Sequence, residues 1–237
     1  MTANTPSSSR SRGRPALPLD RILAAALELV DEQGADALSM RSLAQRLGSG
    51  TATLYRRFAS RSELVALMVD RMIGETDVRA VASLPWQQAC MSLAQSMFDA
   101  LGQHGNVASL FIGHVPVGPN ALTQRELVLS VLLDNGFAPA VAAHTYATLS
   151  RYVLGFAIQV SGSADGAPSE TEISAAFRQL DAVQYPATAA VADKLPVPLV
   201  EEFEFGLRLI VAGLERSLGS PQAQSAEVLD HGVHRRR

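Results

Sequence analysis

Residues Ser39–Phe58, which read SMRSLAQRLGSGTATLYRRF, constrain the fold of this chain more than any other stretch. The first half predicts a short helix, because apolar side chains recur at intervals of three and four residues as far as Leu47. A Gly-Ser-Gly tripeptide then breaks the pattern, and Thr51 can cap a second short helix with Leu54 and Phe58 on its apolar side. Two short helices joined by such a turn predict a helix-turn-helix, whose second helix can enter the major groove of DNA.

The side chains that remain on the outside of the second helix suit contact with DNA. With its two apolar residues turned inward, the helix presents a methyl group, a hydroxyl, a phenol and two guanidiniums, which can contact phosphates and base edges. A plain helical hairpin with a solvated charged face would have the same spacing, so the pattern alone leaves both interpretations open. These outward residues are Ala52, Thr53, Tyr55, Arg56 and Arg57.

The charge of the chain is divided unevenly between this region and the rest. The net charge is −3, but residues 1–62 carry nine arginines and five acidic residues, a local charge of +4. The remaining residues carry eleven basic and eighteen acidic residues, a charge of −7. The asymmetry indicates a basic DNA-binding unit attached to an acidic body with another role.

Composition excludes several other classes of protein. Hydrophobic residues make up 47% and charged residues 18% of the 237, as in an ordinary globular protein. No apolar run is long enough to span a membrane, and the arginine-containing N-terminus lacks the apolar stretch of a secretory signal. Cys90 is the single cysteine, which rules out an intrachain disulfide and favours a reducing compartment. We therefore expect a cytoplasmic protein.

Periodicity predicts an all-α chain in four parts. Residues 1–18 are a disordered arm, in which Arg10, Arg12 and Arg14 either reach a minor groove or merely solubilise the chain. Residues 19–64 form a three-helix DNA-binding unit, residues 65–219 a helical effector and dimerisation domain, and residues 220–237 a disordered tail. A capping box at Ser60 begins the linker helix, which we expect to reach about residue 82. The body helices are expected at about 86–101, 106–115, 120–135, 139–162, 172–183 and 198–218, with an irregular connector at 184–197.

The segment from RGRPALPLDRI to SRSELV resembles the N-terminal DNA-binding domain of TetR-type transcriptional repressors. Its most diagnostic pieces are ALELVDEQG, SMRSLAQRLG and TATLYRRF followed by SRSEL. The resemblance implies that Arg41 and residues 51–55 read bases, whereas Tyr55, Arg57 and Arg61 hold phosphates. Ser49 departs from the family, which usually has an apolar turn residue there. The expected DNA-contacting set is Arg41, Thr51, Ala52, Thr53, Tyr55, Arg56, Arg57 and Arg61.

The last helix, Pro198–Leu218, is apolar on two sides. One stripe runs through Phe203 and Leu207, and a second through Phe205 and Leu209. A helix of this kind needs two partners, and the second is either another subunit or a larger monomeric core. EFEFGLRLIVAGLERSL resembles the final helix of the tetracycline-repressor branch, which implies a homodimer built from this helix and Pro139–Gly162.

The body is expected to enclose a pocket between its helices. Aromatic and thioether side chains are the candidate walls, although a stripe of such residues is more often plain core. Three histidines are the polar candidates, but His104, His114 and His144 lack metal-ligand spacing, so we expect no metal site and no cofactor. The candidate lining residues are Trp86, Met97, Phe98, Phe111, His114, Tyr146, Tyr152 and Phe177.

The resemblance to tetracycline repressors also bears on the effector. In those proteins a histidine on the short helix after the Trp-led helix holds the magnesium ion that arrives with the drug. Laying LFIGHVP against that segment puts Phe111 in the place of the histidine and His114 one turn further on. We therefore expect an effector that is more apolar than a tetracycline–magnesium chelate.

No enzymatic motif is present: the sequence lacks a glycine-rich phosphate loop, a nucleophile elbow, His-Glu-x-x-His and Cys-x-x-Cys. Cys90 is either a redox sensor or a buried thiol, and its apolar surroundings favour the second. The predicted function is a ligand-responsive regulator that binds a palindromic operator, with repression as the family default and activation left open. The alternatives are a helical enzyme or carrier, and a regulator that responds to a partner protein.

Overall fold

The computed structural model describes residues 17–75, 81, 83–111, 116–161 and 168–218. Regular structure in these residues is entirely helical, which confirms the all-α prediction. Residues 1–16 of the expected arm, His114 and the tail from residue 219 lie outside the described residues. The elements are α1 (Leu19–Gln33), η1 (Ala35–Ala37), α2 (Met40–Arg46), α3 (Thr51–Tyr55), α4 (Arg61–Gly74), α5 (Trp86–Gln103), η3 (Gly105–Phe111), α6 (Pro119–Asp134), α7 (Pro139–Ser161), α8 (Glu170–Arg178), α9 (Pro186–Ala190), η4 (Ala192–Lys194) and α10 (Leu199–Leu218).

The first helices form a small unit around a shared core. α1 crosses α2 and α4, and the inward residues Leu54 and Phe58 are almost fully buried against them. Ser39 caps α2 as expected, since its Oγ accepts a hydrogen bond from the Ser42 amide at 3.0 Å. The start of α3 differs from the prediction: Gly50 occupies the N-cap position, and Thr51 is the first helical residue and makes no cap.

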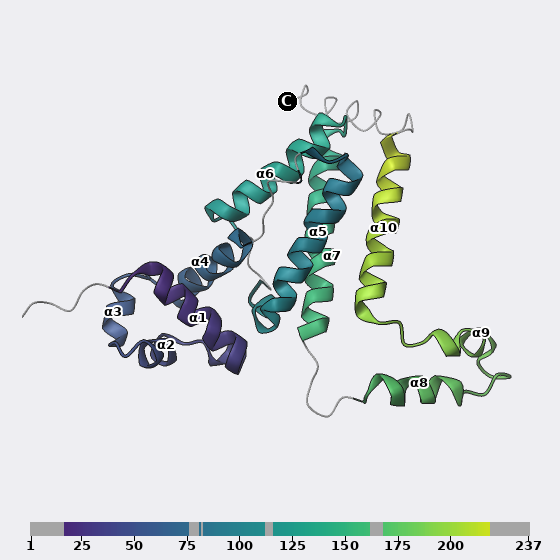
Figure 1. Cartoon of the computed structure of the whole chain (residues 1–237), viewed down its shortest axis with the longest axis horizontal. Coiled ribbons are helices and arrows are strands. Elements are labelled where there is room, and N and C mark those ends of the chain that lie inside the picture. Colours follow the sequence, from purple (N-terminus) through teal and green to yellow (C-terminus); the bar gives the residue numbers. More distant parts are fainter. Residues whose placement is uncertain (1–16, 76–80, 82, 112–115, 162–167, 219–237) are drawn as a thin grey trace, which may run out of the picture.

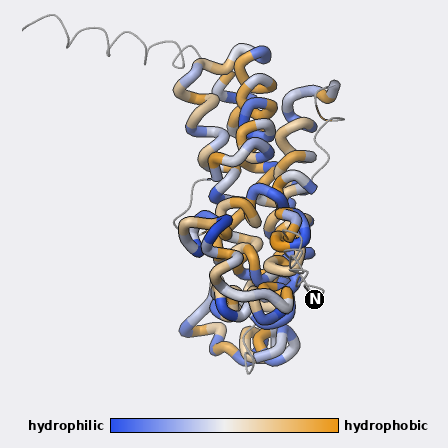
Figure 2. Tube along the Cα trace, turned by 90° about the vertical axis from the view of Figure 1, so that its left-hand side faces the viewer, coloured by the Kyte–Doolittle hydropathy of each residue, from blue (hydrophilic) through white to orange (hydrophobic). Residues whose placement is uncertain are grey.

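α5 and α7 form the centre of the body, and α6 and α10 pack around them (Figure 1). The hydropathy colouring in Figure 2 shows apolar and polar residues interleaved along the helices, as expected where a helix buries one side. Phe203 of α10 is fully buried and stacks on Phe98 of α5, with ring centroids 4.2 Å apart. The described residues contain no helix long and apolar enough to cross a membrane.

Three predicted elements differ from the structure. α4 ends at Gly74 instead of continuing to about residue 82; the glycine lies against the Asn120 side chain, where a Cβ would not fit. The helix expected at 106–115 is a 3₁₀ helix, η3, as far as Phe111. The connector expected to be irregular contains α9, which begins at Pro186, and η4. With α8, these two elements project away from the bundle (Figure 1).

Candidate DNA-binding surface and internal cavity

Most of the predicted DNA-contacting residues are exposed on the N-terminal unit. Leu54 is buried, whereas Tyr55 on the same short helix is 58% exposed. Arg41 is exposed in the first turn of α2, and Arg56 donates from Nη2 to the Thr53 hydroxyl at 3.2 Å. One side of α3 is therefore buried, and the other side exposes the polar residues that the sequence pattern predicts there. The exposed members of the expected set are Arg41, Thr51, Ala52, Tyr55, Arg56, Arg57 and Arg61, and Thr53 is half-buried.

Two arginines of this unit connect its helices to one another. Arg61 donates from Nε to the carbonyl of Leu38 at 2.7 Å and from Nη2 to that of Ala35 at 3.2 Å, which ties the start of α4 to η1. Arg46 holds the Glu32 carboxylate with two hydrogen bonds of 2.7 and 2.6 Å, and its guanidinium lowers the pKa of Glu32. Arg46 therefore joins α2 to α1. Arg61 keeps further N–H donors that remain available beside the candidate DNA-binding surface.

The turn of the helix-turn-helix contains one residue that departs from the family pattern. The Ser49 hydroxyl is buried and has no hydrogen-bond partner among the described residues. An apolar residue at this position would avoid the cost of burying an unpaired hydroxyl. The turn keeps its shape despite this, because Gly48 supplies a φ of 60° and the Ser49 amide donates to the Ala44 carbonyl at 2.9 Å.

A buried carboxylate connects the linker helix to the body. Asp70 of α4 is 5% exposed and accepts hydrogen bonds from the Ala121 amide at 2.9 Å and the Asn120 amide at 3.3 Å. These amides belong to the first turn of α6, whose helix dipole favours a negative charge. A side chain on Gly118 would overlap the Asp70 carboxyl, so the close approach requires glycine there. Asp70 thus acts as the N-terminal cap of a helix distant in sequence.

His104 connects α1, α4 and α5 at a second point. Its Nδ1 lies 2.8 Å from Oδ2 of Asp31 on α1, and its Nε2 lies 3.3 Å from Oε2 of Glu75 at the end of α4. Burial of the ring opposes protonation, but Asp31 and Glu75 outweigh it, and the pKa of His104 is raised above its usual value. Arg71 also faces this group, with its Nε 3.8 Å from Oε1 of Glu75.

The raised pKa of His104 makes the stability of this junction depend on pH. The contribution of His104 is complete below about pH 6.5, its usual pKa, and disappears as the pH rises through the higher folded-state pKa. Between about pH 6 and about pH 8.5 we therefore expect the melting temperature to fall more in the wild type than in His104→Gln, by a few degrees. His144→Gln, at an exposed position of α7, should follow the wild type. Parallel curves for all three proteins would contradict the prediction.

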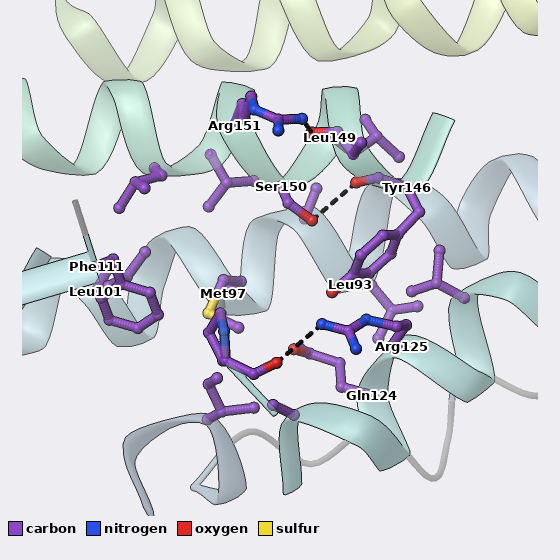
Figure 3. Close-up of a pocket in the computed structure, with 18 of the residues that line it drawn as sticks. Leu93, Met97, Leu101, Phe111, Gln124, Arg125, Tyr146, Leu149, Ser150 and Arg151 are labelled. Atoms are coloured by element: carbon purple, nitrogen blue, oxygen red, sulfur yellow. Dashed lines mark hydrogen bonds between the residues drawn. The ribbon is translucent and has the colours of Figure 1, made fainter. Parts of the chain in front are cut away.

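A cavity of about 620 Å³ lies between α4, α5, α6 and α7, closed on one side by η3 (Figure 3). This volume is suitable for a small organic ligand. Its walls are mostly apolar, and polar groups come from α6 and α7. The lining residues include Leu93, Met97 and Leu101 of α5, Phe111 of η3, Gln124 and Arg125 of α6, and Tyr146, Leu149, Ser150 and Arg151 of α7.

The structure brings three of the predicted pocket residues to this cavity and leaves four away from it. Met97, Phe111 and Tyr146 line it. Trp86 instead packs edge-on against Phe137, with centroids 4.9 Å apart. The others lie elsewhere in the body: Phe98 and Tyr152 stack with Phe203, Tyr152 also donates to the Phe203 carbonyl at 2.8 Å, and Phe177 lies on α8.

Sequence reasoning missed Arg125 and Asp70. A signal for the first exists, because Arg125 follows Ala121 by four residues and precedes Val128 by three, so a charge interrupts the buried stripe of α6. A single carboxylate within the apolar part of α4 offers no comparable signal, since its partners are fifty residues away.

Cys90 also lines the cavity and is buried. Burial raises the pKa of its thiol to about 11, so the reactive thiolate does not form at neutral pH. This environment supports the interpretation of Cys90 as a structural thiol. Within the described residues, no group of three or more His, Cys, Asp or Glu side chains could hold a metal ion.

Comparisons with known proteins agree with this arrangement. Residues 22–68 match the family described as bacterial regulatory proteins, tetR family, and residues 83–218 match the tetracyclin repressor-like C-terminal domain. The HTH-type transcriptional repressor DrrR1 of Streptomyces coeruleorubidus is 28% identical over 91% of this chain and 84% of its own length. The tetracycline repressor protein class E of Escherichia coli is 32% identical over 60% of this chain and 68% of its own length.

Among solved structures, apo ActR from Streptomyces coelicolor is 30% identical and superposes with a TM-score of 0.79, covering 87% of this chain and 99% of that chain. Both halves of the chain thus match the two domains of one family, in the order in which the structure places them. The chain therefore belongs to the TetR family of bacterial transcriptional regulators, which bind DNA and are not enzymes.

Proposed function

We propose that this chain is a homodimeric repressor that leaves a palindromic operator when a small, largely apolar effector fills the cavity. The observation that carries the proposal is a continuous connection: α6 forms a wall of the cavity, and its first turn is held by Asp70 of the helix that follows the DNA-binding unit. The relatives support it, because DrrR1 is a repressor and ActR has been crystallised with actinorhodin and with (S)-DNPA.

The proposed DNA-binding domain is residues 19–64. Arg41 and residues 51–55 would contact base edges, whereas Tyr55, Arg57 and Arg61 would hold phosphates. Two such units related by a two-fold axis would read half-sites about 34–36 Å apart on double-stranded DNA. The exposure of this surface supports the assignment.

The proposed effector and dimerisation domain is residues 65–219, and the dimer would form through α7 and α10. The second apolar stripe of α10 supports this, because Phe205 and Leu209 are 58% and 57% exposed in the single chain. Large apolar side chains gathered along one helix are typical of a surface that a second copy covers. The dimer would act in the cytoplasm.

The proposed effector is not a tetracycline–magnesium chelate. Phe111, which stands where tetracycline repressors have a metal-binding histidine, contributes an apolar ring to the cavity wall. An apolar ring cannot ligate a hard cation. The effector would release the operator by binding the two conformations of the protein with different affinity, transmitted through α6, Asp70 and α4.

Two arginine variants test the DNA-binding part of the proposal. Fluorescence anisotropy on the chain's own promoter fragment, across a salt series, should detect tight and sequence-preferring binding. Arg41→Ala should lose about 1–3 kcal/mol of discrimination between operator and altered operator, because it removes a base contact. Arg57→Ala should weaken binding to all duplexes about equally and reduce the salt dependence, because it removes a phosphate contact.

Arg178→Ala, at an exposed position of α8 far from this surface, is the matched control and should bind like the wild type. If both test variants lose only overall affinity, the two roles are assigned wrongly. Weak binding of the wild type to every duplex would refute the proposal that this protein is a repressor.

A regulator that responds to a partner protein is the second candidate. Such a protein would not need an internal cavity of about 620 Å³ lined by apolar side chains, and the cavity therefore favours a small effector.

A further inference from the structure

The charge of the cavity is uniform in sign although its walls are mostly apolar. Arg125 and Arg151 are the charged residues that line it, and no acidic residue lines it within the described part of the chain. The described residues also form no ion pair with either arginine. Within the described residues, neither arginine is therefore neutralised by an ion pair.

Arg125 lines the cavity, and a hydrogen bond and a ring contact orient its guanidinium. It occupies the buried stripe of α6, between Ala121 and Val128, and is itself half-buried. Its Nη2 donates to the Pro116 carbonyl at 2.9 Å, and its Cζ lies 5.4 Å from the centre of the Tyr146 ring. Figure 3 shows the guanidinium below that ring, at the side of the cavity formed by α6. One N–H is thus used, and others remain available for a ligand.

The other polar side chains at the cavity are Arg151, Ser150 and Gln124. Arg151 is exposed, and its Nη1 donates to the Ala147 carbonyl one turn back at 3.3 Å. The Ser150 hydroxyl donates to the Tyr146 carbonyl at 2.8 Å. Gln124, next to Arg125, can donate or accept a hydrogen bond. Arg125 is accordingly the only one of the two arginines that combines partial burial with a fixed orientation over a ring.

We propose that the effector of this protein is an aromatic organic anion, whose carboxylate or phenolate accepts hydrogen bonds from Arg125 while its ring system fills the apolar part of the cavity. The inference rests on the proposed function, because it assigns a chemical class to the effector of the same cavity. A partly desolvated guanidinium with spare donors favours an anion strongly, and it repels a cation of the same shape. Cations of the same shape are therefore expected to bind more weakly than anions.

Isothermal titration calorimetry with three naphthalene probes of nearly equal shape tests the charge preference. 2-Naphthoate is the anion, 2-naphthamide its neutral counterpart and 2-naphthylmethylammonium the cation. The wild type should bind the anion at least about tenfold more tightly than the amide, and the cation more weakly than the amide. Arg125→Gln should remove this preference while it keeps the affinity for the amide. Arg178→Gln, which changes an exposed arginine outside the cavity, should leave all three affinities unchanged.

The outcomes separate this inference from the proposed function. If the amide binds as tightly as the anion, the effector cavity stands and the anionic class is wrong. If the preference for the anion persists in Arg125→Gln, Arg125 does not read the charge, and the inference is overturned as well. If none of the probes binds, the cavity does not admit a fused ring, and both the inference and the effector part of the proposed function fail. Retained binding of the amide by Arg125→Gln would show that this variant is folded.

Discussion

Asp70→Ala is expected to destabilise the protein by about 2–4 kcal/mol and to separate effector binding from DNA release. The substitution leaves two amides in the first turn of α6 without an acceptor, in a place where water cannot easily replace it. It also removes the contact through which movement of α6 reaches α4. The variant should still bind DNA and effector at low temperature, but the effector should reduce its operator affinity less than in the wild type.

Chemical denaturation measures the loss of stability, and operator anisotropy with and without effector measures the coupling. Asp134→Ala is the matched control, because Asp134 is exposed at the C-terminal end of the same helix, where a negative charge is unfavourable. It should change the free energy of unfolding little. Asp70→Asn keeps one acceptor oxygen, so its free energy of unfolding should fall between those of Asp70→Ala and Asp134→Ala. Normal effector response in a destabilised Asp70→Ala protein would show that Asp70 only caps α6.

Leu209→Glu is expected to convert the dimer into a monomer and to weaken operator binding by about 100-fold or more. Leu209 is 57% exposed on α10, beside Phe205, and a carboxylate there would be buried without a partner in the proposed interface. A monomer offers a single DNA-binding unit to a two-fold operator and loses the second half-site. Light scattering after gel filtration measures the mass, and anisotropy measures DNA binding.

Leu122→Glu is the control for this experiment. Leu122 is 48% exposed on α6, away from α10, so the same change of side chain should leave both the mass and the operator affinity unchanged. The fold should survive in both variants, because neither position is part of the core, and circular dichroism would verify this. A dimeric Leu209→Glu protein would refute an interface on this side of α10.

The local sequence pattern was sufficient to predict most helices and the exposed surface of α3. Leu54 and Phe58 had to be buried because they are the apolar residues of an otherwise polar turn, and the structure buries both. α1 and α7 begin at the predicted residues, and α7 ends within one residue of the predicted position, since their apolar periodicity and flanking glycines or prolines are local signals. The same reasoning could not foresee that Gly74, at the end of α4, lies against Asn120, because Asn120 is distant in sequence.

The candidate cavity was harder to predict because aromatic residues are core residues as often as pocket residues. Met97, Phe111 and Tyr146 line the cavity, whereas Trp86 and Tyr152 fill the core beside it. All five residues occupy apolar positions of helical segments, so periodicity does not distinguish pocket residues from core residues. Only the angle at which the helices cross decides which of them face a gap.

The sequence by itself therefore determined the all-α class, the helix-turn-helix with its outward arginines and the double apolar face of α10, because these follow from spacing along one helix. Tertiary structure alone decided where the cavity lies, that Arg125 enters it, and that Asp70 and His104 join the DNA-binding unit to the body. Those features are pairings between residues that lie from nine to more than seventy positions apart. They depend on how the helices pack against one another, which the periodicity of a single segment does not determine.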